Sequence, residues 1–142
     1  MRLDTILLFT FPLMSLALTN PQRFHPRDDL RGDPEDTVKC ETSKGSPMVS
    51  EVLKAADELK NSKNYDLRCV QGNVFASHCT ELAKYGSSRI MLCGWGVSAG
   101  YYIWCREAAM AAKRIVDDCK NDNRVGGQYS FKHAPLIVQV SY

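Results

Sequence analysis

Apolar side chains recur every three or four positions in two segments of the chain, which is the spacing of one face of an α-helix. We expect the first helix over residues 47–60, with Ser46 as its N-cap and Pro47 as its first residue. We expect the second over residues 99–120, where charged residues occupy the positions between the apolar ones. The apolar positions are Val49, Val52, Leu53, Ala56 and Leu59 in the first helix and Trp104, Cys105, Ala108, Ala109, Ala112, Ile115, Val116 and Cys119 in the second. Both helices should therefore pack one apolar face on a core.

Shorter segments between these helices have the composition of β-strands. Residues 65–70 are expected to be extended, and residues 75–85 and 89–93 are expected to form a hairpin around a Gly-Ser-Ser turn. The first arm of the hairpin also fits a short helical turn, because Cys79, Leu82 and Ala83 have helical spacing. We favour the strand for this arm.

The most pronounced strand pattern lies near the C-terminus, where residues 136–140 read Leu-Ile-Val-Gln-Val. A turn is expected just before it, at Val125-Gly126-Gly127, because glycine pairs interrupt regular structure. The simplest packing of all these elements is an α+β fold with two helices packed on one antiparallel sheet, an α/β sandwich stabilised by disulfides.

The first 39 residues lack the pattern of a packed domain. An apolar run over residues 5–18 predicts a secretory signal peptide, residues 1–17, because the run is too short for a transmembrane helix and Pro12 interrupts it. Residues 18–39 are rich in proline and charge, so we expect a disordered leader or pro-segment. The cysteine-rich domain is then expected at residues 40–142, in a protein that is secreted, extracellular and without a stable membrane anchor.

Six cysteines lie in the expected domain, at Cys40, Cys69, Cys79, Cys93, Cys105 and Cys119. An even number of cysteines in a small secreted domain predicts a disulfide framework, because such a domain buries little apolar surface. On one continuous helix Cys105 and Cys119 would lie about 21 Å apart, so they cannot pair with each other. We expect each of them to tie the helix to a different element, and the individual pairings stay open.

The net charge of the chain is small: 18 basic and 16 acidic residues give a formal charge of +2 at pH 7. This balance argues against nucleic-acid binding, which requires clustered positive charge. The glycine-rich segment 94–100 has neither the dinucleotide-binding nor the P-loop spacing, and the cysteines lack the Cys-X-X-Cys spacing of metal sites. We therefore expect no cofactor and no metal ion.

Aromatic residues are concentrated between residues 95 and 104. We take Trp95, Tyr101 and Tyr102 as candidate binding residues, because exposed aromatic rings anchor partner proteins and stack on sugar rings. Trp95 is expected to be the most exposed of them. The structural alternative places Trp104 in the core and uses the two tyrosines to cover the edge of the sheet.

A catalytic alternative is a secreted ribonuclease, which needs a carboxylate or histidine base, a histidine acid and a cation for the phosphate. Glu81, His78, Arg89 and His133 would supply these residue types if the strands brought them together. Polar residues on exposed strands explain the same positions without catalysis. We therefore assign no catalytic residue and favour a non-enzymatic protein.

Several short motifs resemble those of a known group of proteins. They are Gly45-Ser46-Pro47 before a helix, Tyr85-Gly86-Ser87 ahead of Ile90-Met91-Leu92-Cys93-Gly94, the alanine-containing stretch from Cys105 to Cys119, and Arg124-Val125-Gly126-Gly127 before the last strand. With these motifs, residues 40–142 resemble the killer-toxin-like secreted effectors of filamentous fungi, which are small cysteine-rich proteins with an α/β sandwich fold.

The resemblance implies a virulence effector or toxin whose partner is a host or competitor protein or a cell-wall target. Such a protein acts outside cells or after translocation into a host cell. The resemblance transfers no catalytic residue, because the matching positions are structural. An extracellular ribonuclease-like enzyme and a carbohydrate-binding protein are the alternatives.

Overall fold

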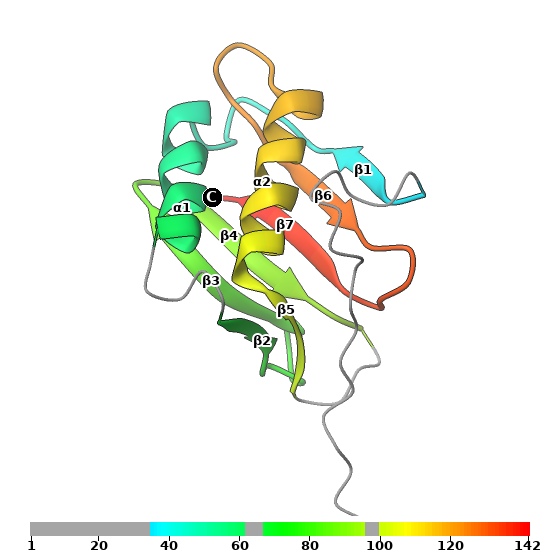
Figure 1. Cartoon of the computed structure of the whole chain (residues 1–142). Helices are drawn as coiled ribbons and strands as arrows, with labels where there is room; N and C mark the ends of the chain where they lie inside the picture. Colours follow the sequence, from blue (N-terminus) through cyan, green and yellow to red (C-terminus); the bar gives the residue numbers. More distant parts are fainter. Residues whose placement is uncertain (1–34, 62–66, 96–99) are drawn as a thin grey trace, which may run out of the picture.

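The computed structural model describes residues 35–61, 67–95 and 100–142, and Figure 1 shows its elements. In chain order these are strand β1 (Thr37–Cys40), helix α1 (Val49–Asn61), strands β2 (Arg68–Gln71), β3 (Cys79–Tyr85), β4 (Ser88–Cys93) and β5 (Tyr101–Trp104), helix α2 (Cys105–Cys119), and strands β6 (Gly127–Ser130) and β7 (Ile137–Ser141). The predicted signal peptide, residues 1–17, and residues 18–34 of the predicted leader lie outside the described residues.

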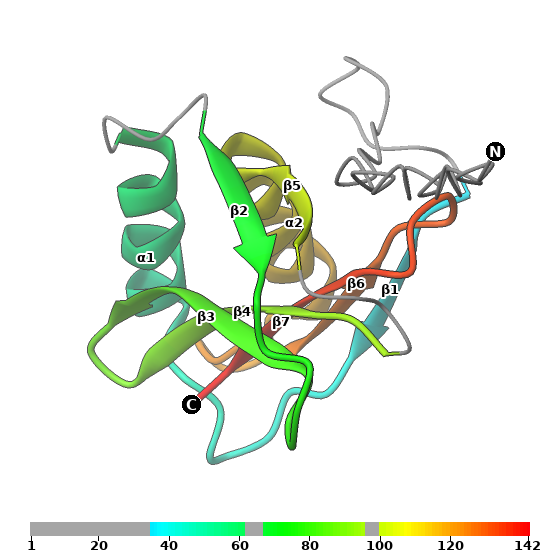
Figure 2. The same cartoon turned by 90° about the horizontal axis from the view of Figure 1, so that it is seen from below.

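In the described part of the chain, five strands form an antiparallel sheet in the order β1-β6-β7-β4-β3, and β2 pairs with β5 in a separate antiparallel ribbon. Both helices lie on the same face of the five-stranded sheet (Figures 1 and 2). Helix α1 packs over β3 and β4, and helix α2 packs over β1, β6 and β7. The predicted α+β class, two helices on an antiparallel sheet with disulfides, is confirmed.

The hydrophobic core lies between the helices and the sheet. Ile90 and Leu92 of β4 and Val138 of β7 are fully buried, and they belong to one cluster with Val52 of α1 and Ile115 of α2. Ile90 and Leu92 are two positions apart, because successive side chains of a strand point to opposite faces of the sheet. The alternate strand residues, which are more polar, therefore lie on the other face of the sheet.

Helix α1 begins at Val49, two residues later than the sequence analysis predicted. Ser46 is not its N-cap, because the Ser46 hydroxyl accepts a hydrogen bond of 2.9 Å from the Ser43 N–H in the preceding turn. Glu51 satisfies the helix start instead: its carboxylate accepts a hydrogen bond of 3.3 Å from the Met48 N–H. A glutamate that reaches back to the residue before the helix is one half of a capping box.

Helix α2 begins at Cys105, so the predicted helix over residues 99–120 is wrong at its N-terminal end. Residues Tyr101–Trp104 form β5, which pairs with β2. The run Tyr-Tyr-Ile-Trp is aromatic and β-branched, which favours a strand where a partner strand is available. The helix starts directly afterwards, where the Glu107 carboxylate accepts a hydrogen bond of 2.8 Å from the Trp104 N–H.

Disulfides join Cys40 to Cys119, Cys69 to Cys105 and Cys79 to Cys93. The prediction that Cys105 and Cys119 do not pair with each other is confirmed. The start of α2 is tied to β2 and its end to β1, so each end is fastened to a different element, as predicted. The third disulfide joins β3 to β4 within the hairpin.

The predicted hairpin is confirmed as β3 and β4, and its first arm is a strand. The strand begins at Cys79 rather than at residue 75, because residues 72–78 form a separate connection. The predicted strand over residues 136–140 is confirmed as β7, and the extended segment predicted up to residue 70 corresponds to β2 in its described part.

Strand β6 was not predicted, because Val125-Gly126-Gly127 was interpreted as a turn. The turn lies earlier, between Asn121 and Arg124, whose backbones bond to each other in both directions. Asp122 and Asn123 adopt positive φ angles of 47° and 60° there, a conformation that aspartate and asparagine tolerate well. Gly127 then begins β6.

Residues 37–39 were assigned to the disordered leader, and this assignment is wrong. They form most of β1, which pairs with β6. Asp36, directly before β1, is also held in place, because its carboxylate accepts hydrogen bonds from the Tyr129 hydroxyl (2.7 Å) and the Lys132 N–H (2.9 Å). Strand β1 is short and mostly exposed, so it carries little of the hydrophobic pattern that identifies a strand.

Candidate functional site

Two connections of the chain meet at one end of the β3–β4 hairpin. One is the segment 72–78, which leads into β3, and the other is Gly94 and Trp95, which follow β4. Cys79 and Cys93 are directly opposite each other in the ladder and are disulfide-bonded. The Gly94 N–H adds a hydrogen bond of 2.9 Å to the His78 carbonyl oxygen. A covalent bond and a backbone hydrogen bond therefore hold these two connections together.

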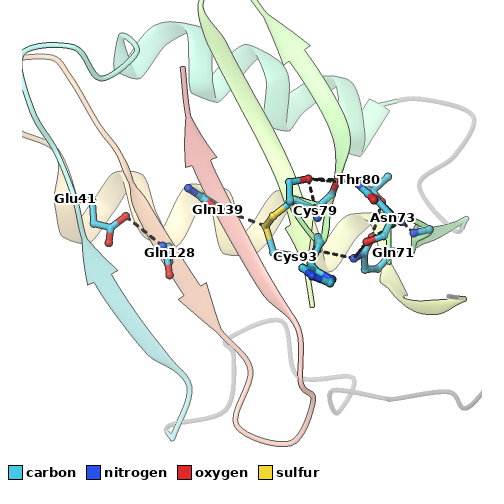
Figure 3. Close-up of a disulfide and its surroundings, with 11 residues drawn as sticks. Glu41, Gln71, Asn73, Cys79, Thr80, Cys93, Gln128 and Gln139 are labelled. Carbon is cyan, nitrogen blue, oxygen red and sulfur yellow. Dashed lines mark hydrogen bonds between the residues drawn. A yellow bond between two sulfur atoms is a disulfide. The ribbon is translucent and has the colours of Figure 1, made fainter. Parts of the chain in front are cut away.

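The side chain of Gln71 organises the first connection from within, as Figure 3 shows. It is completely buried, and its Nε2 atom donates hydrogen bonds to the carbonyl oxygens of Asn73 (2.7 Å) and His78 (2.6 Å). Its Oε1 atom accepts hydrogen bonds from the Asn73 N–H (2.9 Å) and the Thr80 hydroxyl (2.6 Å). All four hydrogen-bonding positions of the amide are thus used, which is how a buried amide avoids a desolvation penalty.

Asn73 extends this network toward the tip of the connection. Its Nδ2 atom donates hydrogen bonds to the Ser77 hydroxyl (3.0 Å) and the Cys79 carbonyl oxygen (3.1 Å). Its Oδ1 atom accepts a hydrogen bond of 3.1 Å from the Phe75 N–H, two residues later, which is an Asx-turn. The backbone of residues 73–79 is therefore fixed by side chains where no regular ladder is available.

The two connections present exposed aromatic rings on this fixed base. Phe75 is 78% exposed and Trp95 is 66% exposed. The imidazole ring of His78 lies against the Trp95 ring, with 4.5 Å between the ring centroids. We call Phe75, His78 and Trp95 the aromatic platform. Apolar rings this exposed on a rigid base are candidates for contact with a partner.

The predicted binding residues differ in how much surface they offer. Trp95 is exposed, as predicted, whereas Tyr101 is half-buried in β5. Tyr102 is only 3% exposed, and the Arg68 guanidinium lies over its ring, 4.6 Å from the centroid. Tyr102 therefore cannot be a contact residue, and its prediction as one is wrong. Its ring also meets the edge of Trp104, 6.3 Å away, so it stabilises the β2–β5 ribbon.

Phe75 and His78 were not predicted as contacts. Phe75 lies in a polar segment, Gly72-Asn73-Val74-Phe75-Ala76-Ser77, where a single apolar side chain gives no periodic signal. A large aromatic residue next to turn-forming residues is the signal that could have identified it.

The predicted ribonuclease set is only partly brought together. Glu81 and Arg89 lie on the adjacent strands β3 and β4, with 3.7 Å between the carboxylate and the guanidinium. His78 contacts Trp95 in the aromatic platform, and His133 lies in the connection between β6 and β7. Glu81 also lines a groove of about 460 Å³ between β2 and β3, whose described lining contains no histidine. The described contacts thus assemble an ion pair rather than an acid–base site.

None of the cysteines in residues 35–61, 67–95 and 100–142 is free. In the same ranges, no group of three or more histidine, cysteine, aspartate or glutamate side chains has the geometry to hold a metal ion. No helix among the described residues is both long enough and apolar enough to cross a bilayer.

Comparison with known proteins places this fold in a family. A model for a domain of unknown function (DUF8794) matches residues 35–142. The chain belongs to this family. The DUF8794 match contains the whole aromatic platform and all six cysteines, and it includes residues 35–39, in agreement with the strand β1. No curated protein and no solved structure matches the chain.

Proposed function

We propose that this protein is a secreted, non-enzymatic effector or toxin-like protein that binds a target of a host or a competing organism through the aromatic platform. The proposal includes its membership of the killer-toxin-like effectors of filamentous fungi, which it resembles in sequence. The observation that carries it is the presence of two exposed aromatic rings, Phe75 and Trp95, on a hydrogen-bonded and disulfide-bonded base. Because this base is already ordered, binding costs little additional conformational entropy.

Two further features support an extracellular binding protein. The six cysteines form three disulfides, and structural disulfides form in oxidising compartments such as the secretory pathway. The aromatic platform is held by one of these disulfides, so its geometry depends on oxidation. Glu81 and Arg89, two members of the predicted ribonuclease set, are paired with each other, which favours binding over catalysis.

The test compares purified wild-type protein with Trp95→Ala and with a matched control, Tyr142→Ala. Tyr142 is equally exposed, at 74%, but it follows the end of β7 that pairs with Arg89, away from Cys93. Both substitutions should leave the fold intact, because exposed side chains contribute little to stability. Each protein is infiltrated into plant tissue and applied to cultures of competing fungi, and cell death, defence responses and growth inhibition are scored.

We expect wild type and Tyr142→Ala to be equally potent and Trp95→Ala to be at least about tenfold weaker, the loss of one aromatic anchor. Equal potency of all three proteins, and of Phe75→Ala, would overturn the assignment of the binding surface. A wild-type protein that produces no response in any of these assays would overturn the effector function itself.

An extracellular ribonuclease is the catalytic alternative, and a separate assay distinguishes it. Purified protein is incubated with RNA, with His78→Ala, Glu81→Gln and His133→Ala as variants. We expect no cleavage above buffer by any of them. Cleavage by wild type that is lost in His78→Ala or His133→Ala would replace the binding proposal with an enzymatic one.

A further inference from the structure

The five-stranded sheet has one face that the two helices do not cover. Because both helices lie on the other face (Figures 1 and 2), this face has no helical cover in the described part of the chain. Figure 3 views it directly, with the helices behind the sheet and the Cys79–Cys93 disulfide in front. The aromatic platform borders it at the end where this disulfide lies, since His78 precedes Cys79 and Trp95 follows Gly94. We call this surface the open face.

The strand register aligns the side chains of the open face in rows across the sheet. One row runs over all five strands and consists of Lys39, Gln128, Gln139, Met91 and Glu81, each directly opposite the next. With about 4.8 Å between neighbouring strands, this row spans about 19 Å. Two glutamines at its centre give it adjacent planar amide groups.

Most charges of the open face are paired with a charge of the opposite sign. The Lys39 ammonium lies 2.7 Å from the Glu41 carboxylate, and Glu41 also accepts a hydrogen bond of 3.2 Å from the Gln128 amide. At the other side of the sheet, Arg89 pairs with Glu81. Lys84, directly opposite Arg89 in the ladder, adds one positive charge without an ion pair among the described residues. The surface is therefore rich in hydrogen-bonding groups, and its three cations and two carboxylates leave a net charge of only +1. It complements a neutral polar ligand better than a phosphate backbone or an acidic membrane.

Gln139, at the centre of the row, has hydrogen-bonding capacity that the described residues do not use. Its Oε1 atom lies 3.6 Å from the Cys93 sulfur, but that sulfur is in a disulfide and has no hydrogen to donate. By contrast, Gln71 uses all four of its positions. An amide of this kind on an uncovered sheet face is available to hydroxyl groups of a ligand.

We propose that the open face and the aromatic platform together bind a neutral polysaccharide, a proposal that rests on the platform being the contact surface of the protein. Trp95 would stack on the apolar face of a sugar ring, as indole rings do. The Gln139 amide would then donate to, and accept from, sugar hydroxyls further along the chain, and Gln128 would do so next to it. The nearly balanced charges add little electrostatic attraction to a neutral ligand, so the interaction should persist at high salt.

The test is sedimentation of the full chain, with its disulfides intact, with insoluble chitin, cellulose and β-1,3-glucan at 0.1 M and 1 M NaCl. The variants are Trp95→Ala and Gln139→Ala, with Tyr142→Ala as the control. We expect binding to at least one polysaccharide that persists at 1 M NaCl and is unchanged in Tyr142→Ala. Trp95→Ala and Gln139→Ala should each weaken it at least about fivefold.

The outcomes separate this inference from the proposed function. If none of the three polysaccharides binds, but Trp95→Ala still abolishes the response of plant tissue or fungal cultures, the polysaccharide is wrong and the platform binds another target, such as a protein. If binding occurs but disappears at 1 M NaCl, the neutral-ligand argument fails. If Trp95→Ala changes neither binding nor response, both proposals fail.

A second variant keeps the open face testable by itself. Gln139→Leu retains the size of the side chain but removes its hydrogen-bonding groups. It should weaken polysaccharide binding as much as Gln139→Ala does, while leaving the thermal unfolding midpoint within a few degrees of wild type. Wild-type affinity in both Gln139 variants, with reduced affinity in Trp95→Ala, would restrict the binding site to the aromatic platform and overturn the role of the open face.

Discussion

The Gln71 side-chain amide donates a hydrogen bond of 2.6 Å to the carbonyl oxygen of His78, and the Gly94 N–H donates one of 2.9 Å to the same oxygen. One carbonyl group thus joins a buried side chain to both connections that carry the aromatic platform. The exposed rings of Phe75 and Trp95 are therefore supported from the interior of the protein. This relationship explains how a surface without regular secondary structure keeps one conformation.

Replacing Gln71 with leucine tests this support. The leucine side chain of Gln71→Leu has a similar volume but leaves the Asn73 carbonyl oxygen and the Thr80 hydroxyl hydrogen without their partner. The Asn73 N–H loses the shorter of its two hydrogen bonds and keeps the one of 3.3 Å to the Thr80 hydroxyl oxygen. We expect the free energy of unfolding, measured by denaturant titration, to fall by about 2–3 kcal/mol, because buried polar groups lose their hydrogen bonds. Hydrogen exchange at the Gly94 amide should become faster, because the acceptor at His78 is no longer fixed.

The matched control is Gln128→Leu, which changes the same residue type on the open face. Gln128 is half-buried and makes one side-chain hydrogen bond, to Glu41. We expect its effect to stay within about 0.5 kcal/mol, as for most surface substitutions. Similar losses in the two variants would show that Gln71 has no special role in the connection.

Much of the fold follows from local sequence patterns. Helix α2, from Cys105 to Cys119, has apolar residues at helical spacing, and β7 has them at every second position. In both elements the apolar residues are the ones buried in the core, so the sequence period predicts the element correctly. The non-pairing of Cys105 and Cys119 also follows, because helix geometry alone separates them.

The parts that could not be predicted depend on partners distant in sequence. Tyr101–Trp104 continues the apolar pattern of α2, and only its pairing with β2, tied by the Cys69–Cys105 disulfide, makes it a strand. The contact between His78 and Trp95 likewise depends on which cysteines are joined, and the sequence left that choice open. Trp95 was identified from its residue type, whereas Phe75 was missed because a single apolar side chain in a polar segment gives no periodic signal.

Gly86, at the turn between β3 and β4, is a position that favours glycine. Its φ angle is +59°, and a Cβ atom there would lie 2.7 Å from the Cδ atom of Glu51. We expect Gly86→Ala to lower the free energy of unfolding by about 1–2 kcal/mol from the backbone conformation alone, with an additional loss from the displaced Glu51. Gly72→Ala is the control, because no atom lies within 4 Å of its Cβ position.

A double substitution separates the two contributions at Gly86. In a Glu51→Ala background the side-chain clash disappears but the positive φ angle remains. Gly86→Ala should therefore cost less in this background than in wild type, and still more than Gly72→Ala. Equal costs in both backgrounds would mean that Glu51 moves aside freely.

Glu51 also responds to pH through its hydrogen bond with Ser87. The Ser87 hydroxyl donates a hydrogen bond of 2.7 Å to the carboxylate, and this bond is the largest cause that lowers the pKa of Glu51 below its ordinary value of 4.5. Because the pKa is lower in the folded state, the bond stabilises the protein above pH 4.5, and this stabilisation disappears as the pH falls through the folded-state pKa.

Ser87→Ala should therefore raise the pKa of Glu51 toward 4.5, which an NMR titration of the side-chain carboxyl carbon measures. The stability difference between wild type and variant should be present at neutral pH and vanish in acid. Asp57 is an internal reference, because its pKa is lowered by a hydrogen bond from Lys113, on a different part of the surface. An unchanged Glu51 titration in Ser87→Ala would assign the lowered pKa to another cause.

The disulfides should differ in what they contribute to stability and to the aromatic platform. Cys40 and Cys119 are 79 residues apart in sequence, whereas Cys79 and Cys93 are 14 apart. In the chain-entropy model, removing the first bond by a double serine substitution costs about 4.5 kcal/mol and removing the second about 3 kcal/mol. Denaturant unfolding of both double variants measures this difference, after peptide mapping has confirmed the two bonds that remain.

The functional effect should be in the opposite order. Cys79→Ser/Cys93→Ser removes the covalent bond between the two connections, so it should weaken Trp95-dependent binding and increase hydrogen exchange at Gly94. Cys40→Ser/Cys119→Ser removes a bond between α2 and β1, far from Trp95 along the sheet order, and should leave binding unchanged under conditions where the protein is folded. If the loss of binding is larger in the variant that loses more unfolding free energy, the Cys79–Cys93 bond contributes to binding only through overall stability. If binding is lost only in Cys79→Ser/Cys93→Ser, the disulfide positions the aromatic platform. The hydrogen bonds of the β3–β4 ladder do not hold His78 and Trp95, because both residues lie beyond the end of that ladder.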